Sequence, residues 1–182
     1  MPSIDTAHLF HQAGWILLVT LTKFLLPLAA GAVLAGLAAR AALSWAENSL
    51  RRRRIRQATS ARDITPRDFE LLCCDLLRAM GYRAKLTPYQ GDGGADIVAR
   101  DGRSRVIIVQ CKRWLRRPVG VNAVRELAGV RMRRNADEAW LISAGTFTAQ
   151  ARVEAKALSI RLIDGYALRR LLREHGLTPQ WE

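Results

Sequence analysis

Residues 91–100 read Gly-Asp-Gly-Gly-Ala-Asp-Ile-Val-Ala-Arg and residues 106–112 read Val-Ile-Ile-Val-Gln-Cys-Lys, with an Asp-Gly turn pair between them. Two β-rich runs joined by such a turn predict a β-hairpin, with strands at 95–100 and 105–113. Polar residues stand at the strand ends. Gln110 and Lys112 are two positions apart and would share one face of their strand, while Cys111 would point to the other. If the hairpin pairs, the carboxylate of Asp96 meets an amide oxygen and an ammonium.

This combination of groups suits phosphodiester hydrolysis. The reaction requires charge to be neutralised on phosphorus and a water to be made nucleophilic. Magnesium prefers oxygen ligands and needs only one or two protein carboxylates, so Asp96 is the first candidate ligand and the Gln110 amide oxygen the second. Lys112 would orient or deprotonate the water, or stabilise the developing charge. Glu70 would add a carboxylate, directly or through water. On these residues alone, an ordinary structural role stays open.

Basic residues are concentrated after residue 49. The chain has 182 residues and a formal net charge of +13, and residues 1–49 hold two basic and two acidic residues, so the whole excess belongs to residues 50–182. A surplus of this size indicates a polyanionic partner, either nucleic acid or anionic lipid. A solvated basic face with no partner is the alternative.

Cysteine usage excludes two classes of site. Cys73, Cys74 and Cys111 are odd in number and lack paired metal-binding spacing, which argues against a disulfide framework and a zinc site and fits a reducing cytosol. We expect Cys73 in the core. Cys111 is not expected to act as a nucleophile, because its strand parity turns it away from the proposed site.

The N-terminal part of the chain is apolar. Between Gly14 and Ala39 only Lys23 is charged. About 20 apolar residues cross a bilayer, so we expect one transmembrane helix at about 15–46, within an N-terminal membrane anchor of residues 1–49. Four arginines follow at 51–54 while the N-terminal flank has no lysine or arginine, so the positive-inside rule puts the C-terminal domain in the cytoplasm, at the inner membrane. A cleaved signal peptide is the competing interpretation, disfavoured by the missing basic n-region and the length of the run.

After the anchor we expect a basic linker at 50–63 and a folded domain at 64–182. Thr65 and Pro66 have the pattern of a helix start, and apolar residues then recur at helical spacing up to Gly81. Besides the hairpin, periodicity predicts strands at 82–86, 139–143 and 160–163, and helices from Val121, at 149–158 and at 166–174. Helices and strands that alternate without a repeat indicate an α/β fold with a mixed central sheet.

Several segments, in their order and spacing, resemble the catalytic domain of Mrr-type restriction endonucleases, from about Thr65 to Leu172. They are Phe69-Glu70, Leu77 to Tyr82, Gly91 to Ile97, Val109 to Arg113 and Gly145 to Thr148. That family belongs to the restriction-endonuclease-like, PD-(D/E)xK superfamily, whose core is a mixed β-sheet flanked by helices, and its Asp/Glu-x-Lys element often occurs as Gln-x-Lys.

The resemblance implies a role for each site residue. The acidic helix residue of the family corresponds to Glu70, its first metal carboxylate to Asp96, and its Gln-x-Lys pair to Gln110 and Lys112. It also implies Mg²⁺ as cofactor, with Mn²⁺ as an alternative, and DNA, double-stranded in the first instance, as substrate.

The first hypothesis is therefore a membrane-tethered, metal-dependent DNA endonuclease, a type IV restriction-like deoxyribonuclease acting against foreign DNA. A non-catalytic nucleic-acid-binding module at the inner membrane surface is the second, because Gln110 stands where a carboxylate is usual, and a lipid-associated scaffold is the third.

Small-xxx-small pairs within residues 31–36 would let two anchors pack, so a homodimer is also expected. The side chains expected to contact phosphates are Arg113, Arg116, Arg117, Arg125, Arg133, Arg134 and Lys156.

Overall fold

The structure is a computed structural model that describes residues 6–58, 62–88 and 93–177. Within the first helix it describes the side chains of Trp15 and of residues from Leu21 onward. The chain divides into two units, Met1–Glu47 and Asn48–Glu182. Each unit is described by itself below.

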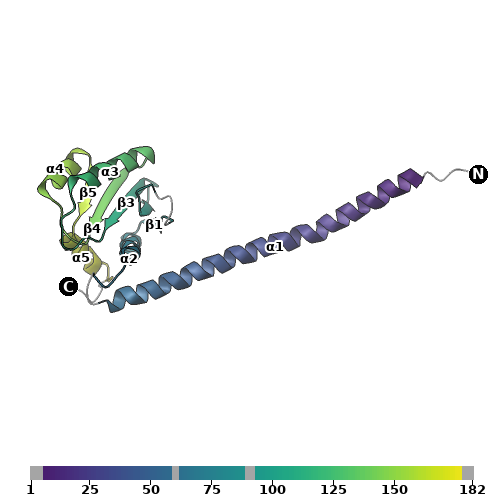
Figure 1. The fold of residues 1–182 in the computed structure, drawn as a ribbon, viewed down its shortest axis with the longest axis horizontal. Coiled ribbons are helices and arrows are strands. Elements are labelled where there is room, and N and C mark those ends of the chain that lie inside the picture. Colours follow the sequence, from purple (N-terminus) through teal and green to yellow (C-terminus); the bar gives the residue numbers. More distant parts are fainter. Residues whose placement is uncertain (1–5, 59–61, 89–92, 178–182) are drawn as a thin grey trace, which may run out of the picture. The chain divides into compact units, whose positions relative to one another are not determined.

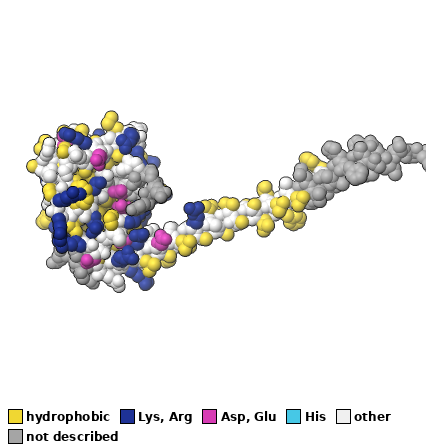
Figure 2. Space-filling view, viewed as in Figure 1, with side chains coloured by type: hydrophobic (Ala, Val, Ile, Leu, Met, Phe, Trp, Pro, Cys, Tyr) yellow, Lys and Arg dark blue, Asp and Glu magenta, His cyan; other side chains and the backbone are white. Residues whose placement is uncertain are grey.

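A single helix, α1 (Thr6–Gln57), makes up the first unit and ends within the second (Figure 1). From Leu21 onward it is long and apolar enough to cross a membrane by length and composition, and its apolar part is not buried in protein. Phe24 is 76% exposed and Trp45 is 70% exposed, and hydrophobic side chains cover this part of the helix (Figure 2). Apolar exposure on this scale marks a surface that contacts lipid or another protein.

The last turns of α1 belong to the second unit. Within the segment expected to be a basic linker, residues 50–63, α1 extends as far as Gln57. Ile55 is buried in the core of the second unit, and Arg52 donates two hydrogen bonds to the Asp75 carboxylate, at 2.7 and 2.8 Å. Arginine has a good helix propensity, and tertiary contacts of this kind are what stabilise a helix in a protein. The helix therefore continues because its basic residues have acidic partners.

Helix α2 (Pro66–Ala79) begins and ends where its capping residues predict. The Thr65 hydroxyl accepts the Asp68 N–H at 3.1 Å and the Asp68 carboxylate accepts the Thr65 N–H at 3.1 Å, which forms a capping box. Pro66 occupies the first helical position, where its missing N–H costs nothing. Gly81 follows the helix with φ +92°, a backbone conformation that suits glycine.

The central sheet has five strands in the order β1-β2-β3-β4-β5. Its first three strands pair antiparallel and its last three parallel, so the mixed sheet expected from the sequence is confirmed. The strands are β1 (Arg83–Leu86), β2 (Ile97–Arg100), β3 (Val106–Lys112), β4 (Glu138–Ser143) and β5 (Ile160–Ile163).

Helices cover both faces of the sheet (Figure 1). One hydrophobic cluster joins α2, α5 (Gly165–Glu174) and the end of α1 to one face, and a second joins α3 (Val121–Arg133) and α4 (Ala149–Ala157) to the other. Successive residues of β3 point into the two clusters in turn, Val109 into the first and Ile108 into the second. Cys111 packs with the α2 cluster, so strand parity sends the two residues beside it toward the α3 and α4 face.

Candidate active site

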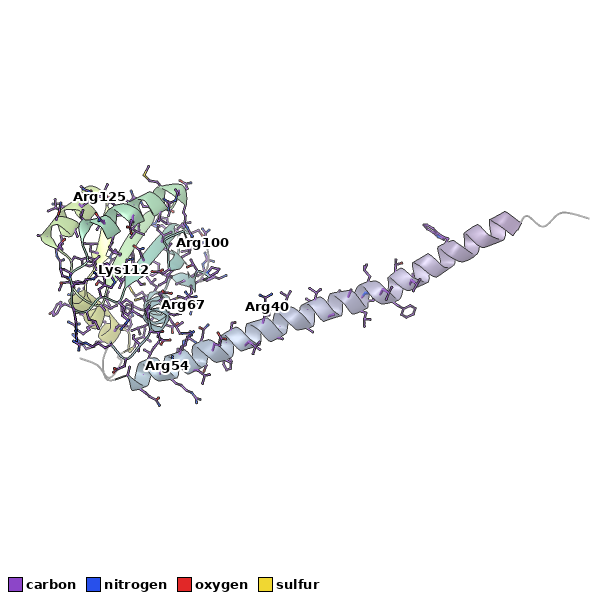
Figure 3. All side chains as sticks on the ribbon, in the orientation of Figure 1. Arg40, Arg54, Arg67, Arg100, Lys112 and Arg125 are labelled. Atoms are coloured by element: carbon purple, nitrogen blue, oxygen red, sulfur yellow. The ribbon has the colours of Figure 1, made fainter. Side chains whose placement is uncertain are left out.

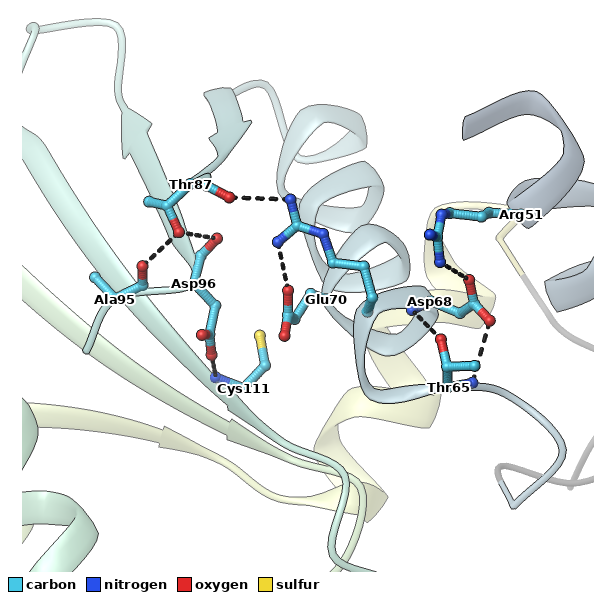
Figure 4. Close-up of polar contacts among 9 residues, drawn as sticks. Arg51, Thr65, Asp68, Glu70, Thr87, Ala95, Asp96 and Cys111 are labelled. Atoms are coloured by element: carbon cyan, nitrogen blue, oxygen red, sulfur yellow. Dashed lines mark hydrogen bonds and ion pairs between the residues drawn. The ribbon is translucent and has the colours of Figure 1, made fainter. Parts of the chain in front are cut away.

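Asp96 lies directly before β2, where the ladder with β3 becomes irregular. The register pairs Ile97 with Val109, yet the Asp96 N–H also donates to the Val109 carbonyl, at 2.9 Å. Two residues therefore face one, which is the pattern of a β-bulge and re-aims a side chain. Asp96 Oδ2 accepts the Cys111 N–H at 2.7 Å (Figure 4). The carboxylate thus lies against the Gln110–Cys111 peptide at the end of β3.

Two glycines precede Asp96 in the described part of the loop, and Gly94 leaves no room for a Cβ. Gly93 and Gly94 have φ +58° and +90°, and a Cβ on Gly94 would lie 2.9 Å from a methyl carbon of Val130 in α3. Positive φ and close approach of a neighbouring side chain therefore both require glycine at Gly94. Gly91 and Asp92, which belong to the same motif, lie outside the described residues.

Thr87, the residue after β1, holds Asp96 from the other side. The Thr87 N–H donates to the Asp96 carbonyl at 2.9 Å, and the Thr87 hydroxyl donates to the carbonyls of Ala95 and Asp96 at 2.6 and 3.1 Å. The Asp96 backbone is therefore fixed to both neighbouring strands. Sequence reasoning missed Thr87, since its only signal is a hydroxyl placed between a short strand and Pro88.

Glu70 reaches the same region from α2. Its carboxylate accepts a hydrogen bond from Arg67 at 2.7 Å, and Arg67 also donates to the Thr87 carbonyl at 2.9 Å. The Glu70 side chain is only 15% exposed. Figure 4 shows the carboxylates of Glu70 and Asp96 on two sides of the Cys111 side chain. The charges of Glu70 and Asp96 both act on the Cys111 thiol. Arg67 is a partner of Glu70 that the sequence did not reveal.

The thiols near this region are held in their protonated form. A hydrogen bond with Cys73 and burial raise the pKa of the Cys111 thiol well above its usual value, and the charges of Asp96 and Glu70 add to the effect. Burial likewise raises the pKa of Cys74 to about 11. Because a thiolate is the reactive species, neither group is activated as a nucleophile. The buried position expected for Cys73 is confirmed.

Gln110 supplies the most informative atom of the region. Its side chain is 8% exposed, and its amide oxygen Oε1 is buried without a hydrogen-bond partner among the described residues. A buried acceptor left unbonded costs about 1–3 kcal/mol, so such an atom calls for an explanation. A bound cation would provide one.

Lys112 lies at the C-terminal end of β3 and lines an open hollow of about 390 Å³. The hollow is bounded by the first turn of α3 and by Thr148, whose hydroxyl caps α4 by accepting the Ala151 N–H at 3.1 Å. The ammonium Nζ lies 5.8 Å from the centre of the Trp114 ring. In Figure 3, Lys112 appears at the sheet, between α2 and α3.

The side chains at the end of β3 include oxygen donors of the kind that divalent metals take. The described residues contain no group of three or more His, Cys, Asp and Glu side chains arranged to hold a metal. Magnesium does not require one, because it takes amide and carbonyl oxygens and retains several waters. The Asp96 carboxylate and the orphaned Gln110 oxygen are two such oxygen donors on neighbouring strands.

A family model described as restriction endonuclease, the Mrr catalytic domain, matches residues 61–172. The chain belongs to this family. The matched region includes Glu70, the glycine-rich residues 91–94 and the Gln-x-Lys residues 110–112 of this chain. The resemblance noted in the sequence is therefore confirmed. No curated protein matches the chain.

Among solved structures, the chain is similar to the DNA modification-dependent restriction endonuclease AspBHI, with 22% identity and a TM-score of 0.52 over 73% of this chain and 37% of that one. The MspJI restriction endonuclease, solved with a 27-mer oligonucleotide, has 28% identity and a TM-score of 0.46 over 58% and 27%. A repair endonuclease from Pyrococcus abyssi has 15% identity and a TM-score of 0.39 over 52% and 46%. The AspBHI likeness shows a shared fold, and the chain spans less than half the length of each of these three proteins.

Replacing Gln110 by methionine should separate stability from activity. Methionine has a similar size and no unbonded oxygen, so we expect Gln110→Met to raise the free energy of unfolding by about 1 kcal/mol. The same change would remove a proposed metal ligand, and we expect DNA cleavage to be lost. Chemical denaturation followed by circular dichroism, alongside a cleavage assay, measures both effects. A less stable variant would mean that Oε1 already has a partner in the protein.

Proposed function

We propose that this chain is a membrane-tethered, metal-dependent DNA endonuclease that acts in restriction of foreign DNA. The observation that carries the proposal is the orphaned oxygen of Gln110 at the strand end where Asp96 is fixed against the β3 backbone. Family membership supports nuclease chemistry at this position. The basic surplus of residues 50–182 supports a polyanionic substrate.

The proposed mechanism assigns each residue a task. A divalent cation, Mg²⁺ in the first instance, would neutralise phosphate charge and favour ionisation of the attacking water. Asp96 and Gln110 would hold the cation, with the Cys111 N–H keeping the Asp96 carboxylate in place. The Lys112 ammonium would orient the water or stabilise the charge that develops on the phosphate. Glu70, itself held by Arg67, would act through a water on the other side.

The proposed location is the inner membrane, with one crossing and the catalytic domain in the cytoplasm. The exposed apolar surface of α1 supports a lipid environment, and the sixteen residues between Lys23 and Arg40 are free of charge. They span about 24 Å, and both flanking side chains can extend toward the interface. The arginines at 51–54 support a cytoplasmic C-terminal side.

A homodimer is also part of the proposal. Small residues at 31–36 would allow two anchors to pack, and double-strand cleavage requires a pair of active sites.

A plasmid assay with a Lys112 variant tests the proposed function. Full-length protein is extracted with detergent from carbonate-washed membranes, and its recovery there checks the anchor. We expect nicked or linear DNA with Mg²⁺ and intact DNA with a chelator. Lys112→Ala should lower the cleavage rate by about 100- to 1,000-fold, as expected for loss of a group that stabilises transition-state charge.

Lys85→Ala is the matched control for this assay, because Lys85 is an exposed lysine of β1, outside the proposed site. Its cleavage rate should equal that of the parent. If plasmid stays intact with both Mg²⁺ and Mn²⁺ while the protein retains it in a salt-sensitive way, the chain is a binding module instead.

A further inference from the structure

The loop between β3 and α3 contains a cluster of arginines that follows Lys112. Residues of this loop line an open hollow of about 390 Å³, and the described residues that line it include no carboxylate. Arg116 and Arg117 are exposed, and neither makes an ion pair within the described part of the chain. The lining residues are Arg62, Arg113, Trp114, Leu115, Arg116 and Arg117.

Trp114 joins this arginine hollow to the hollow that contains Lys112, because its ring lines both. The Arg117 guanidinium carbon lies 4.2 Å from the ring centre, and Lys112 Nζ lies 5.8 Å from it. The negative face of an indole ring attracts cations and partly offsets their mutual repulsion. The proposed catalytic lysine and a surface arginine therefore both lie close to one ring.

The hollow around Lys112 continues this positive surface. Its wall includes Gly120, which begins α3 without a side-chain cap, and the first-turn residues Val121 to Ala123. Uncapped N–H groups at a helix start carry partial positive charge. Glu126, one turn further along, is the single carboxylate among the described residues of this wall.

Two of the other basic residues expected to contact phosphates, Arg125 and Arg133, are engaged within the protein. Arg125 donates to the Glu154 carboxylate at 2.7 Å, and Arg133 donates to the Gly93 carbonyl at 3.2 Å. The Glu154 carboxylate offsets the charge of Arg125. The Gly93 carbonyl occupies one N–H group of Arg133. The structure therefore distinguishes the exposed arginines of the β3–α3 loop, which are available to a ligand, from those of α3 that have partners within the protein. The sequence alone does not show this difference.

We infer that the DNA backbone follows these two hollows across Trp114, with Arg116 and Arg117 binding phosphates next to the one cleaved beside Lys112. This inference rests on the proposed function for its substrate. Beyond that function, the inference gives the route of the DNA strand across the protein and names two phosphate-binding residues outside the catalytic group. Trp114 is a positioning residue in this arrangement, because it acts through Lys112 and Arg117.

Duplex binding measured without added metal tests the path. Full-length protein in detergent is titrated with a fluorescent duplex at several salt concentrations. Each phosphate contact contributes about 0.9 to the slope of log affinity against log salt, so Arg116→Gln with Arg117→Gln should lower that slope by about 2. The charge-matched control is Arg103→Gln with Arg173→Gln, which removes two exposed arginines elsewhere on the domain and should leave the slope unchanged.

Cleavage by the same proteins separates the inference from the proposed function. A parent protein that cuts DNA, with the same salt slope in both double variants, would overturn the path and leave the nuclease in place. A parent that binds with the expected slopes but never cuts would overturn the nuclease and leave the path. Trp114→Leu should lower both affinity and cleavage, and Trp114→Phe, which keeps a ring face, should restore most of each. Equal losses in these two variants would contradict a positioning role for the ring.

Discussion

Asp96→Asn is expected to abolish metal-dependent DNA cleavage, with a loss of at least about 1,000-fold. Asparagine keeps an oxygen that can accept the Cys111 N–H, now 2.7 Å from Asp96 Oδ2, so the strand end should keep its shape. The negative charge that would hold the cation is lost. We therefore expect a folded protein that binds duplex DNA and does not cut it, measured by plasmid cleavage over a range of Mg²⁺ concentrations.

Asp137→Asn provides a closely matched control. Asp137 accepts the N–H of Val106 at 2.6 Å, at the opposite end of the same strand, β3. The substitution and the type of hydrogen bond are the same in both variants, and only the end of the strand differs. Asp137→Asn should cut DNA at the parental rate. Comparable activity in the two variants would remove Asp96 from the catalytic group and, with it, the proposed metal site.

Much of the fold could be predicted because its signals are local. The capping box at Thr65 and the glycine after α2 need only neighbouring residues to act. The hairpin of β2 and β3 follows from period-two patterning, and the same period assigns Gln110 and Cys111 to opposite faces. These are the places where local preference and tertiary structure agree.

Features that depend on contacts between distant elements could not be predicted. The helix of α1 continues through its arginines because Asp68 and Asp75 of α2 meet them, and nothing near residue 55 indicates those partners. Thr87 and Arg67 matter for the same reason. Arg67 connects α2 to Thr87 after β1, and Thr87 connects to Asp96 just before β2. Whether an arginine on α3 is available to DNA likewise depends on how α4 packs beside it.

Asp68→Ala is expected to lower the free energy of unfolding of the second unit by about 3 kcal/mol. Asp68 is fully buried, lies 3.0 Å from Arg51 and 3.5 Å from Arg54, and completes the capping box with Thr65. Loss of a cap costs about 1 kcal/mol, and loss of one partner of a buried ion pair costs about 3–5 kcal/mol. The two arginines are partly exposed, so we expect the ion-pair loss to fall below that range, at about 2 kcal/mol, which with the cap gives about 3 kcal/mol. Chemical denaturation of the full-length protein in detergent, followed by circular dichroism, measures the change.

Asp164→Ala is the control for burial. Asp164 begins α5 in the same way, since its carboxylate accepts the Ala167 N–H at 3.0 Å and pairs with Arg152 at 2.9 Å. Its side chain is 23% exposed, so water can replace part of what is lost. We expect a cost of about 1 kcal/mol. Equal losses in the free energy of unfolding for Asp68→Ala and Asp164→Ala would mean that Asp68 stabilises the fold only as a helix cap, with no further contribution from its burial.

The pH dependence of Asp68→Asn separates the charge of this residue from its shape. Burial acts to raise the pKa of the Asp68 carboxyl, but the Thr65 amide, the Thr65 hydroxyl and the Arg51 guanidinium outweigh it, so the folded-state pKa lies below its ordinary value. The ionised group therefore stabilises the fold above its unfolded-state pKa of about 3.9, and this stabilisation is lost as pH falls through the lower folded-state pKa. The parent should be more stable than Asp68→Asn at about pH 7, and the difference should shrink below about pH 4. A difference that stays constant down to about pH 3 would show that the hydrogen bonds alone, without the charge, hold the end of α1 to α2.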